Sequence, residues 1–465
     1  MKNIILVDRS CELIDEFIAR GCRIVVLVVE THEQAQAYRA AYTQEQIEII
    51  THRFALESVI ALEHLDYDLI ESFRDTQRKI EFTYHRDFRD TMLVTNKYFN
   101  ALCWWNHIFD THAIDFVFNN AIEHILLCEL CLPIAQKRGI PAFCAPTRLI
   151  FAPNILDYAT KSYIPLCGDT LNDEQLAENF YFHFDFGWIP PFYQRHSKVG
   201  NAMMRLLLRL GGSLLVDFLV WGRNVLVGKE GSRFKENLLS YVQLMRMKHY
   251  YKKISTQPKE GEKFIFYAIQ FEPEGNTSVC VPLQNQLSVI QMLSRALPEG
   301  YKLYVKEHPM QFSLNKPRMY YYLYNFGYFK NRSFYKELEK LPNVRFIDLD
   351  VSSKELNQKA LAVATINGTV HLEATFFCGK PCIVFGGHNM LLKNAKNIVY
   401  VESFEDLCNG VKTLLENPQS FVLSEAEIHQ YKTYIKARSI YHQSPTKARD
   451  MLDSVLAYLA ERENA

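Results

Sequence analysis

The chain has 465 residues, of which 48% are hydrophobic, and its 52 basic and 52 acidic side chains give a formal net charge of zero. This length suits two or three domains with sizeable cores, and we expect no nucleic-acid partner. The 11 cysteines do not show the spacing of a disulfide framework, and the apolar run at residues 1–8 is too short for a signal peptide. We therefore expect reduced thiols and a cytoplasmic protein.

The first half alternates strand and helix patterns, which is typical of a parallel, doubly wound sheet. The expected strands are 3–7, 23–29, 47–51, 114–118 and 141–144. The expected helices are 12–20, 32–42, 90–109 and 122–138. In the last helix, Cys128 and Cys131 form a CxxC pair, which we assign to core packing because no second pair accompanies it.

A basic segment follows the first half. Residues 191–260 carry 13 lysines and arginines against 4 acidic residues, which suggests an anionic partner. The apolar stretches 203–210 and 214–227 are interrupted by charges, and neither has the roughly 20 uninterrupted apolar residues of a membrane span. Two interpretations stay open: an interfacial helix on an anionic bilayer, or a domain-packing helix with a solvated basic face.

A second α/β unit begins at Lys263. Its expected strands are 264–269, 303–305, 344–347, 362–366 and 382–385, and its expected helices are 284–296, 353–359, 370–377, 404–416 and 445–462. The aromatic-rich residues 320–328 are interpreted as an insertion packed on this unit. The expected domains are 1–200, a basic helical connecting segment 201–262, 263–440, and a C-terminal helix 441–465. Such a pair of α/β domains is expected to form a cleft between its two carboxyl edges.

Polar residues follow three strands of the second unit, at the edge where open α/β sheets bind ligands. Residues 270–278 offer two carboxylates, two amides and two hydroxyls. Residues 306–309 read Lys-Glu-His-Pro, and His308 there can donate to a phosphate. Residues 365–373 combine a strand end, a glycine turn and a helix start, whose N–H groups and Thr369 hydroxyl can bind an anion. Each group alone also suits an ordinary turn, but the three together predict phosphate and sugar binding.

These residues resemble the bacterial capsular polysaccharide biosynthesis glycosyltransferases, which include the β-Kdo transferases that use CMP-Kdo. The stretches that carry the resemblance are 270–274, 284–309, 341–347, 365–374 and 379–386. The first half resembles the family only in its α/β pattern. The resemblance implies a GT-B fold, with two Rossmann-like domains facing across a cleft, distantly similar to bacterial sialyltransferases that also use a His-Pro motif on the CMP phosphate.

The same resemblance implies a set of donor-binding residues. By position, His308 binds the CMP phosphate together with Thr369 and the Gly368 backbone, and Glu373 holds the ribose. The implied set also includes Gln270, Lys306 and Asn367.

The catalytic residues that the resemblance implies are Glu274 and His308, with Glu123 as a candidate acid/base partner. The β-Kdo transferases have a Gln-x-x-x-Asp motif whose aspartate is the proposed nucleophile, and here the same spacing joins Gln270 to Glu274. The glutamate adds one methylene of reach, which suits a different ulosonic sugar such as a nine-carbon nonulosonate. Glu123 opens a predicted helix, so electrostatics at a helix N-terminus would also explain it.

The sequence therefore predicts a glycosyltransferase that moves an ulosonic acid, Kdo or a sialic-type sugar, from a CMP-sugar to a surface polysaccharide or lipid-linked glycan, with retention. We expect no cofactor and no required metal, since Asp348 and Asp350 suit a helix cap and a CMP-sugar carries one phosphate. Asp66 and Asp68 have the same Asp-x-Asp spacing as Asp348 and Asp350. We expect peripheral contact with an anionic membrane on its cytoplasmic face. A nucleotide-sugar epimerase and a non-catalytic capsule assembly or export component are the alternatives.

Overall fold

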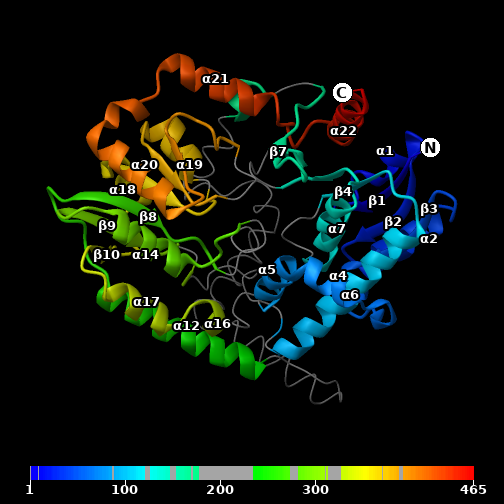
Figure 1. The fold of residues 1–465 in the computed structure, drawn as a ribbon, viewed down its shortest axis with the longest axis horizontal. Coiled ribbons are helices and arrows are strands. Elements are labelled where there is room, and N and C mark those ends of the chain that lie inside the picture. Colours follow the sequence, from blue (N-terminus) through cyan, green and yellow to red (C-terminus); the bar gives the residue numbers. More distant parts are fainter. Residues whose placement is uncertain are drawn as a thin grey trace, which may run out of the picture.

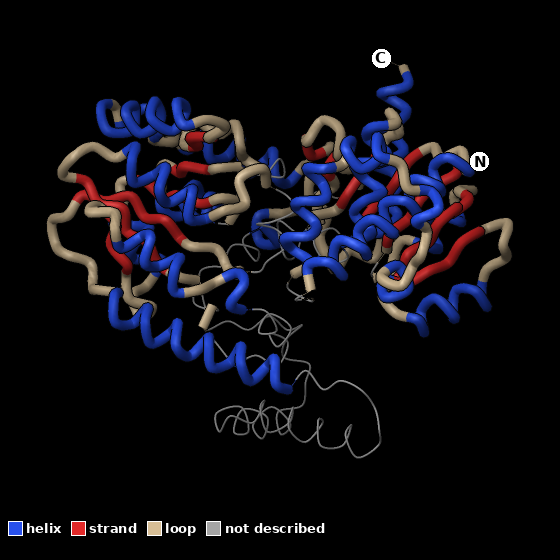
Figure 2. The backbone as a smooth tube through the Cα atoms, turned by 60° about the horizontal axis from the view of Figure 1, so that its bottom comes forward, coloured by secondary structure: helices blue, strands red, loops and turns tan. Residues whose placement is uncertain are grey.

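The computed structural model describes most of the chain as two α/β domains (Figure 1). The described residues are 2–8, 10–85, 88, 90–120, 126–146, 153–168, 171–176, 234–272, 281–308, 311–312, 326–368, 370–386 and 391–464. In each domain the strands form one sheet with helices packed around it, as Figure 2 shows.

The first sheet has the strand order β3-β2-β1-β4-β5-β6-β7. Its strands are β1 (Asn3–Val7), β2 (Arg23–Val29), β3 (Ile47–His52), β4 (Phe116–Asn119), β5 (Ala142–Cys144), β6 (Leu156–Asp157) and β7 (Ser162–Tyr163). The first five pair in parallel, and β6 and β7 extend the edge as antiparallel strands. β1 and β2 are nearly continuous apolar runs that are buried on both faces, as helix-covered parallel strands are.

The helices of the first domain are α1 (Ile14–Ala19), α2 (His32–Ala41), α3 (Arg53–Leu56), α4 (Tyr67–Ser72), α5 (Arg74–Tyr84), α6 (Thr91–Thr111) and α7 (Cys131–Lys137), with 3-10 turns η1 (Leu62–His64) and η2 (Leu126–Leu130). The predicted helix 122–138 is partly wrong, because its described part divides into η2 and α7. Pro133 lies in the first turn of α7, where the missing N–H of proline is tolerated, and a helix that ran through it would lose a hydrogen bond.

The second sheet has the strand order β10-β9-β8-β11-β12-β13, and every pairing in it is parallel. Its strands are β8 (Lys263–Ala268), β9 (Tyr301–Lys306), β10 (Val344–Phe346), β11 (Ala362–Thr365), β12 (Cys382–Val384) and β13 (Ile398–Tyr400). Numbered within the domain, this order is 3-2-1-4-5-6, the order of a dinucleotide-binding Rossmann sheet. The strand order therefore reverses between β8 and β11.

The remaining helices are α12 (Phe234–Ile254), α14 (Gln286–Ala296), α16 (Phe326–Phe329), α17 (Arg332–Glu339), α18 (Ser353–Lys359), α19 (Val370–Glu373), α20 (Phe404–Glu416), α21 (Glu425–Lys436) and α22 (Lys447–Glu463), with the turn η5 (Pro418–Phe421). The predicted helix 370–377 continues beyond α19 as a π-turn, η4 (Ala374–Cys378). It ends at Gly379, whose φ of 57° is in the left-handed region that favours glycine at a helix end.

Two helices show how the chain connects the domains. α12, which belongs to the predicted connecting segment, packs into the second domain, where the buried Tyr251 hydroxyl donates to the carbonyl oxygen of Ile347 at 2.7 Å. The C-terminal helix α22 packs beside α1 on the first domain (Figure 1), and Asp453 pairs with Arg20 at 2.7 Å. No helix among the described residues is both long and apolar enough to cross a bilayer.

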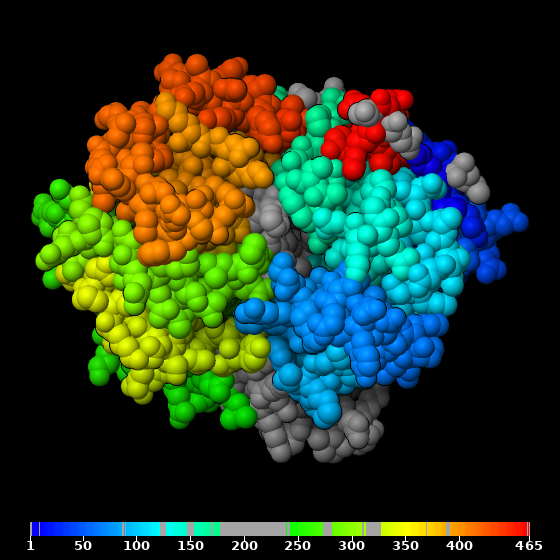
Figure 3. Space-filling model, in the orientation of Figure 1, coloured from blue at the N-terminus to red at the C-terminus, as the bar shows by residue number. Residues whose placement is uncertain are grey.

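The domains touch through an aromatic contact and an apolar one. In the aromatic contact, Phe82 on α5 lies with its ring centroid 5.3 Å from Phe329 on α16, and His85 lies 4.4 Å from Tyr328. Tyr328 of the segment 320–328 thus also contacts the first domain, and residues 320–325 of that segment lie outside the described residues. In Figure 3, first-domain surface in blue to cyan adjoins second-domain surface in green to orange.

The apolar contact places Leu372, Leu391 and Leu392 of the second domain in a common core with first-domain side chains. Beside it lies a hollow of about 150 Å³, lined by Lys161, Ser162, Tyr163, Leu391, Leu392, Lys393, Asn394, Ala395, Tyr431 and Tyr434. The two Rossmann-like domains have sheets that are parallel apart from the antiparallel edge strands β6 and β7, and a final helix returns to the first domain, which is a GT-B architecture. The predicted fold class is confirmed.

Candidate functional site

The described residues of the three polar groups predicted at strand ends lie at one edge of the second sheet. β8 pairs with β9 on one side and with β11 on the other, so their carboxyl ends are neighbours. The N–H of Ile269 donates to the carbonyl oxygen of Lys306 at 2.9 Å, which extends the β8–β9 pairing beyond the strands. The strand order reverses between β8 and β11, and such a switch point is where open α/β sheets bind ligands.

Gln270 and Gly368 meet at this switch point. A Cβ on Gly368 would lie 3.0 Å from Nε2 of Gln270 and 2.8 Å from Oγ1 of Thr365, so only glycine fits there without a shift. The Gly368 N–H also donates to Oγ1 of Thr365 at 3.0 Å. A side chain at Gly368 would thus press on Thr365 of its own turn and on the end of the Gln270 side chain from the β8 end, which favours glycine at this position. Asn367, between Thr365 and Gly368, is buried.

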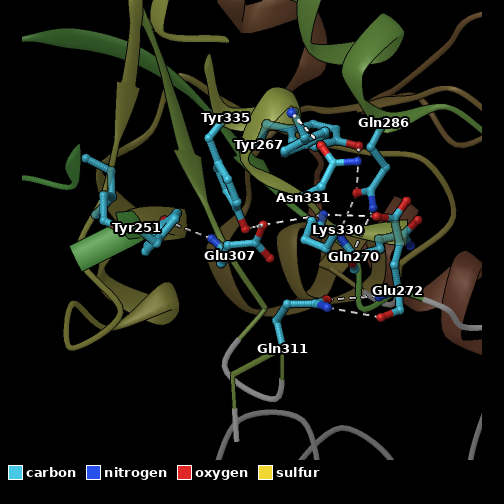
Figure 4. Close-up of polar contacts among 12 residues, drawn as sticks. Tyr251, Tyr267, Gln270, Glu272, Gln286, Glu307, Gln311, Lys330, Asn331 and Tyr335 are labelled. Carbon is cyan, nitrogen blue, oxygen red and sulfur yellow. Dashed lines mark hydrogen bonds and ion pairs between the residues drawn. The ribbon is translucent and has the colours of Figure 1, made fainter. Parts of the chain in front are cut away.

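The backbone of Gln270 is held by Gln286 on α14. The Gln270 N–H donates to Oε1 of Gln286 at 2.8 Å, and Nε2 of Gln286 donates back to the Gln270 carbonyl oxygen at 3.1 Å. Figure 4 shows the two side chains together. Gln286 is buried and pairs both backbone groups of Gln270. This role was not predicted from the sequence, because an isolated glutamine at a helix start resembles an ordinary polar residue.

His308 lies at the end of β9, half-buried, next to the β8 loop. Its ring centroid is 5.9 Å from the ring of Phe271, with 57° between the planes, and the Gln311 N–H donates to its carbonyl oxygen at 2.9 Å. The imidazole is thus placed at the same edge as Gln270. Pro309 lies outside the described residues.

Lys306 and Glu373 are both connected to α18. The Lys306 ammonium donates to Oγ of Ser353 at 3.1 Å, and Nδ2 of Asn357 donates to Oε2 of Glu373 at 3.4 Å. Burial lowers the pKa of Lys306, while Asp348 and Asp350 act in the opposite direction. Burial raises the pKa of Glu373 to about 7. The contribution of Lys306 and Glu373 to ligand binding stays a prediction.

A buried ionic cluster under the same edge was not predicted from the sequence. The Lys330 ammonium lies 3.0 Å from Oε2 of Glu272 and 3.3 Å from Oε1 of Glu307 (Figure 4). The Tyr335 hydroxyl donates to the same Oε1 of Glu307 at 2.8 Å. Glu307 is therefore enclosed by protein, although its charge was predicted to lie at the ligand-binding edge with Lys306 and His308.

The charge balance of this cluster follows from burial and from its composition. Burial acts to lower the pKa of Lys330, but the two carboxylates outweigh it and the pKa is raised, so the side chain stays an ammonium. Burial raises the pKa of Glu307, and Glu272 adds to that effect as a second negative charge. One ammonium between two carboxylates neutralises only one of them.

Three predicted site residues, Glu123, Glu274 and Thr369, lie outside the described residues, and their roles stay predictions. At the corresponding edge of the first sheet, the buried Asp8 accepts hydrogen bonds from the Leu13 N–H at 2.7 Å and from Ser10 Oγ at 3.0 Å. These bonds shape the turn that leads from β1 into α1.

Among the described residues, no three or more His, Cys, Asp or Glu side chains are grouped so that they could hold a metal ion. Asp348 and Asp350 lie in a local turn, in which the Asp350 N–H donates to Oδ1 of Asp348 at 3.1 Å. The cap of α18 is Ser352, whose side chain accepts from the Glu355 N–H. The expectation that Asp348 and Asp350 suit a helix cap is therefore wrong, because the cap of α18 lies two residues after Asp350. Cys128 and Cys131 are buried in the first core.

Comparisons with known proteins give no family assignment. No family model matches the sequence, and no curated protein matches it. Solved structures that align with the fold include the glycotransferase of kitacinnamycin, 12% identical over 97% of this chain and 99% of that one, with a TM-score of 0.28. A Thermosulfurimonas dismutans KpsC, a β-Kdo 2,7 transferase, is 15% identical over 50% of this chain and 68% of that one, with a TM-score of 0.22.

A UDP-forming α,α-trehalose-phosphate synthase from Burkholderia xenovorans also aligns, at 8% identity over 91% of this chain and 73% of that one, with a TM-score of 0.31. At these identities and TM-scores the similarities carry no argument about activity. The GT-B architecture described above rests on the strand orders and pairings of this chain.

Proposed function

We propose that this protein is a glycosyltransferase that moves an ulosonic acid, Kdo or a sialic-type sugar, from a CMP-sugar to a surface polysaccharide or lipid-linked glycan. The observation that carries the proposal is the meeting of Gln270, His308 and Gly368 at the carboxyl edge of a sheet with Rossmann strand order. That edge suits a nucleotide, and its histidine and tight glycine turn suit a single phosphate. The choice of CMP and of an ulosonic sugar follows the family resemblance of the sequence.

In this proposal the second domain binds the donor. The His308 imidazole donates to the CMP phosphate, and the Gly368 backbone approaches the same phosphate without obstruction by a side chain. The Thr369 hydroxyl is assigned to the phosphate as well. Glu373 is assigned to the ribose hydroxyls, for which it can accept hydrogen bonds when ionised and donate one when protonated.

Glu274 is proposed as the essential carboxylate of the transfer. In the retaining version it attacks the anomeric carbon as CMP leaves, and the acceptor hydroxyl then displaces it from the sugar. In an inverting version it would instead take the proton of the acceptor hydroxyl. Glu123 in the first domain is the proposed acid/base partner. The neutral charge and the basic segment 191–260 suit an enzyme at the cytoplasmic face of an anionic membrane, where a lipid-linked acceptor is available.

Nucleotide selectivity tests the donor half of the proposal. CMP should raise the melting temperature of the protein, because a ligand that binds only the native state stabilises it, and UDP and GDP at equal concentration should raise it less. An equal effect of the three nucleotides would refute the choice of CMP. Release of CMP from a CMP-sugar only in the presence of a glycan acceptor would distinguish a transferase from an epimerase and from a non-catalytic component.

Turnover of Glu274→Gln tests the chemical half. The carboxamide is nearly isosteric, so we expect the variant to bind CMP normally and to lose turnover at least a hundredfold. The anomeric configuration of the wild-type product, read by NMR, then separates the two roles. Retention supports a nucleophile, whereas inversion with a dead variant supports a general base. Near-normal turnover of the variant would remove Glu274 from the chemistry.

A further inference from the structure

Lys330 joins two loops that carry candidate donor ligands. Its ammonium contacts Glu272, which lies two residues after Gln270 on the β8 loop, and Glu307, which immediately precedes His308 at the end of β9. The Lys330 and Glu307 side chains have no solvent exposure, and that of Glu272 is 9% exposed. These contacts therefore differ from surface ion pairs, which water and salt weaken.

Each of the two glutamates is also held from its own side, Glu272 through its backbone and Glu307 through its backbone N–H and its carboxylate. The Glu272 N–H donates to Oε1 of Gln311 at 3.0 Å, and Nε2 of Gln311 donates to the Glu272 carbonyl oxygen at 3.0 Å. The Glu307 N–H donates to the Tyr251 hydroxyl at 3.0 Å, and Tyr335 donates to the Glu307 carboxylate. The cluster thus has two anchored halves, and among the described residues Lys330 is the side chain that pairs with both carboxylates.

The backbone at Lys330 is held by its neighbours. Phe329 and Tyr328, which precede it, contact Phe82 and His85 of the first domain. The Asn331 side chain, which follows it, accepts from the Phe334 N–H and caps α17. Lys330 therefore extends into the cluster from a fixed point, and its ammonium also lies 4.3 Å from the Phe334 ring centroid.

Buried ion pairs are costly to form, and apolar residues of similar volume often stabilise a fold as well or better. Such a cluster is best explained by a need to hold the segments that it joins in a fixed geometry. Resting on the proposed function, we propose that Lys330 is a positioning residue that fixes the spacing between the Gln270 loop and the His308 turn, and with it the geometry of donor binding. The residue itself does not touch the donor.

Lys330→Met tests this role, because methionine keeps an unbranched chain of similar reach and removes the charge. We expect at least tenfold faster amide hydrogen exchange in the two segments 269–272 and 306–308, and at least tenfold weaker binding of CMP by calorimetry. The matched control is Lys340→Met, which removes an exposed lysine that pairs with Glu337 at the end of α17. The control should leave both measurements unchanged.

The exchange pattern separates positioning from a general structural role. Loss of stability alone would speed exchange throughout the second sheet, including β12 and β13, whereas loss of positioning speeds it in the two loops. Uniform acceleration, or unchanged exchange in both loops, would overturn the proposal. If wild-type protein does not bind CMP but the local pattern is present, the proposed donor fails and the positioning role stands.

Two further variants keep the test decisive if Lys330→Met does not fold. Glu272→Gln and Glu307→Gln each leave the ammonium with one carboxylate, so the remaining pair is neutral. We expect Glu272→Gln to speed exchange in 269–272 and to spare 306–308, and Glu307→Gln to show the reverse. Equal effects of each variant on both segments would contradict a link between two separately anchored halves.

Discussion

At the scale of single residues, the candidate site combines side chains that could be predicted from the sequence with side chains that could not. His308, Gln270 and Gly368 follow strands, so their position at one sheet edge could be predicted. Lys330 and Gln286 could not, because no sequence pattern joins them to the strand ends. Their roles depend on side chains that meet only after the domain folds. A lysine between two distant glutamates carries no local signal.

Glu373 offers a test of the electrostatics at this edge. Its pKa in the folded protein is raised to about 7, so the protonated form is favoured by folding. This contribution to stability is fully present below the pKa of the unfolded chain and is lost as the pH rises through about 7. Glu373→Gln should therefore gain stability relative to wild type between pH 5 and pH 8, by about 2 kcal/mol. Urea unfolding at the two pH values measures the difference, and a constant difference would contradict the assigned pKa.

At the scale of elements, strands were easier to predict than helices. β1, β2 and β8 are buried apolar runs of the expected length, and they start and end within one or two residues of the predicted bounds. The helices α4, α5 and α21 were not predicted, because they are rich in polar residues and bury few side chains. Packing and caps define them: Ser424 caps α21 with a reciprocal bond to Glu427.

The order of the strands in the sheet also could not be predicted from the sequence. The alternating pattern predicts a parallel sheet, but it does not say that β8 lies between β9 and β11. That neighbourhood is what brings the Gln270 amide against Gly368. The predicted strand ends were therefore right as separate positions, and the structure shows that they share one switch point.

The helix α12 packs into the second-domain core through Leu244 and Met247, and Tyr251 hydrogen-bonds it to the sheet. Tyr251 donates to the Ile347 carbonyl oxygen and accepts from the Glu307 N–H, and it is fully buried. Tyr251→Phe should lower the free energy of unfolding by about 1–3 kcal/mol, since it leaves both backbone groups without their partner. The control is Tyr250→Phe at the neighbouring, more exposed position, which should change it by less than about 1 kcal/mol. Urea unfolding compares them, and equal effects would refute the attachment.

At the scale of the whole molecule, the two domains meet through the aromatic contact at Phe329 and the apolar contact at Leu391 and Leu392, and the basic segment of the sequence is largely outside the described residues. We expect residues 195–253 to bind anionic lipid reversibly, because their basic excess adjoins the apolar stretch 214–227. Vesicle co-sedimentation should show binding to anionic vesicles that falls with added salt. Equal binding to neutral vesicles would contradict the electrostatic contribution, and absence of binding to either would contradict the whole expectation.

The central claim is that the carboxyl edge of the second sheet binds the phosphate of CMP through His308. Calorimetric titration of CMP into wild type, His308→Ala and the control His429→Ala, an exposed histidine on α21, tests it most directly. A charge-assisted hydrogen bond is worth about 1.5–3 kcal/mol, so His308→Ala should weaken binding roughly ten- to a hundredfold. The control should bind as wild type does. Equal affinity of wild type and His308→Ala, or absence of CMP binding to wild type, would contradict the account.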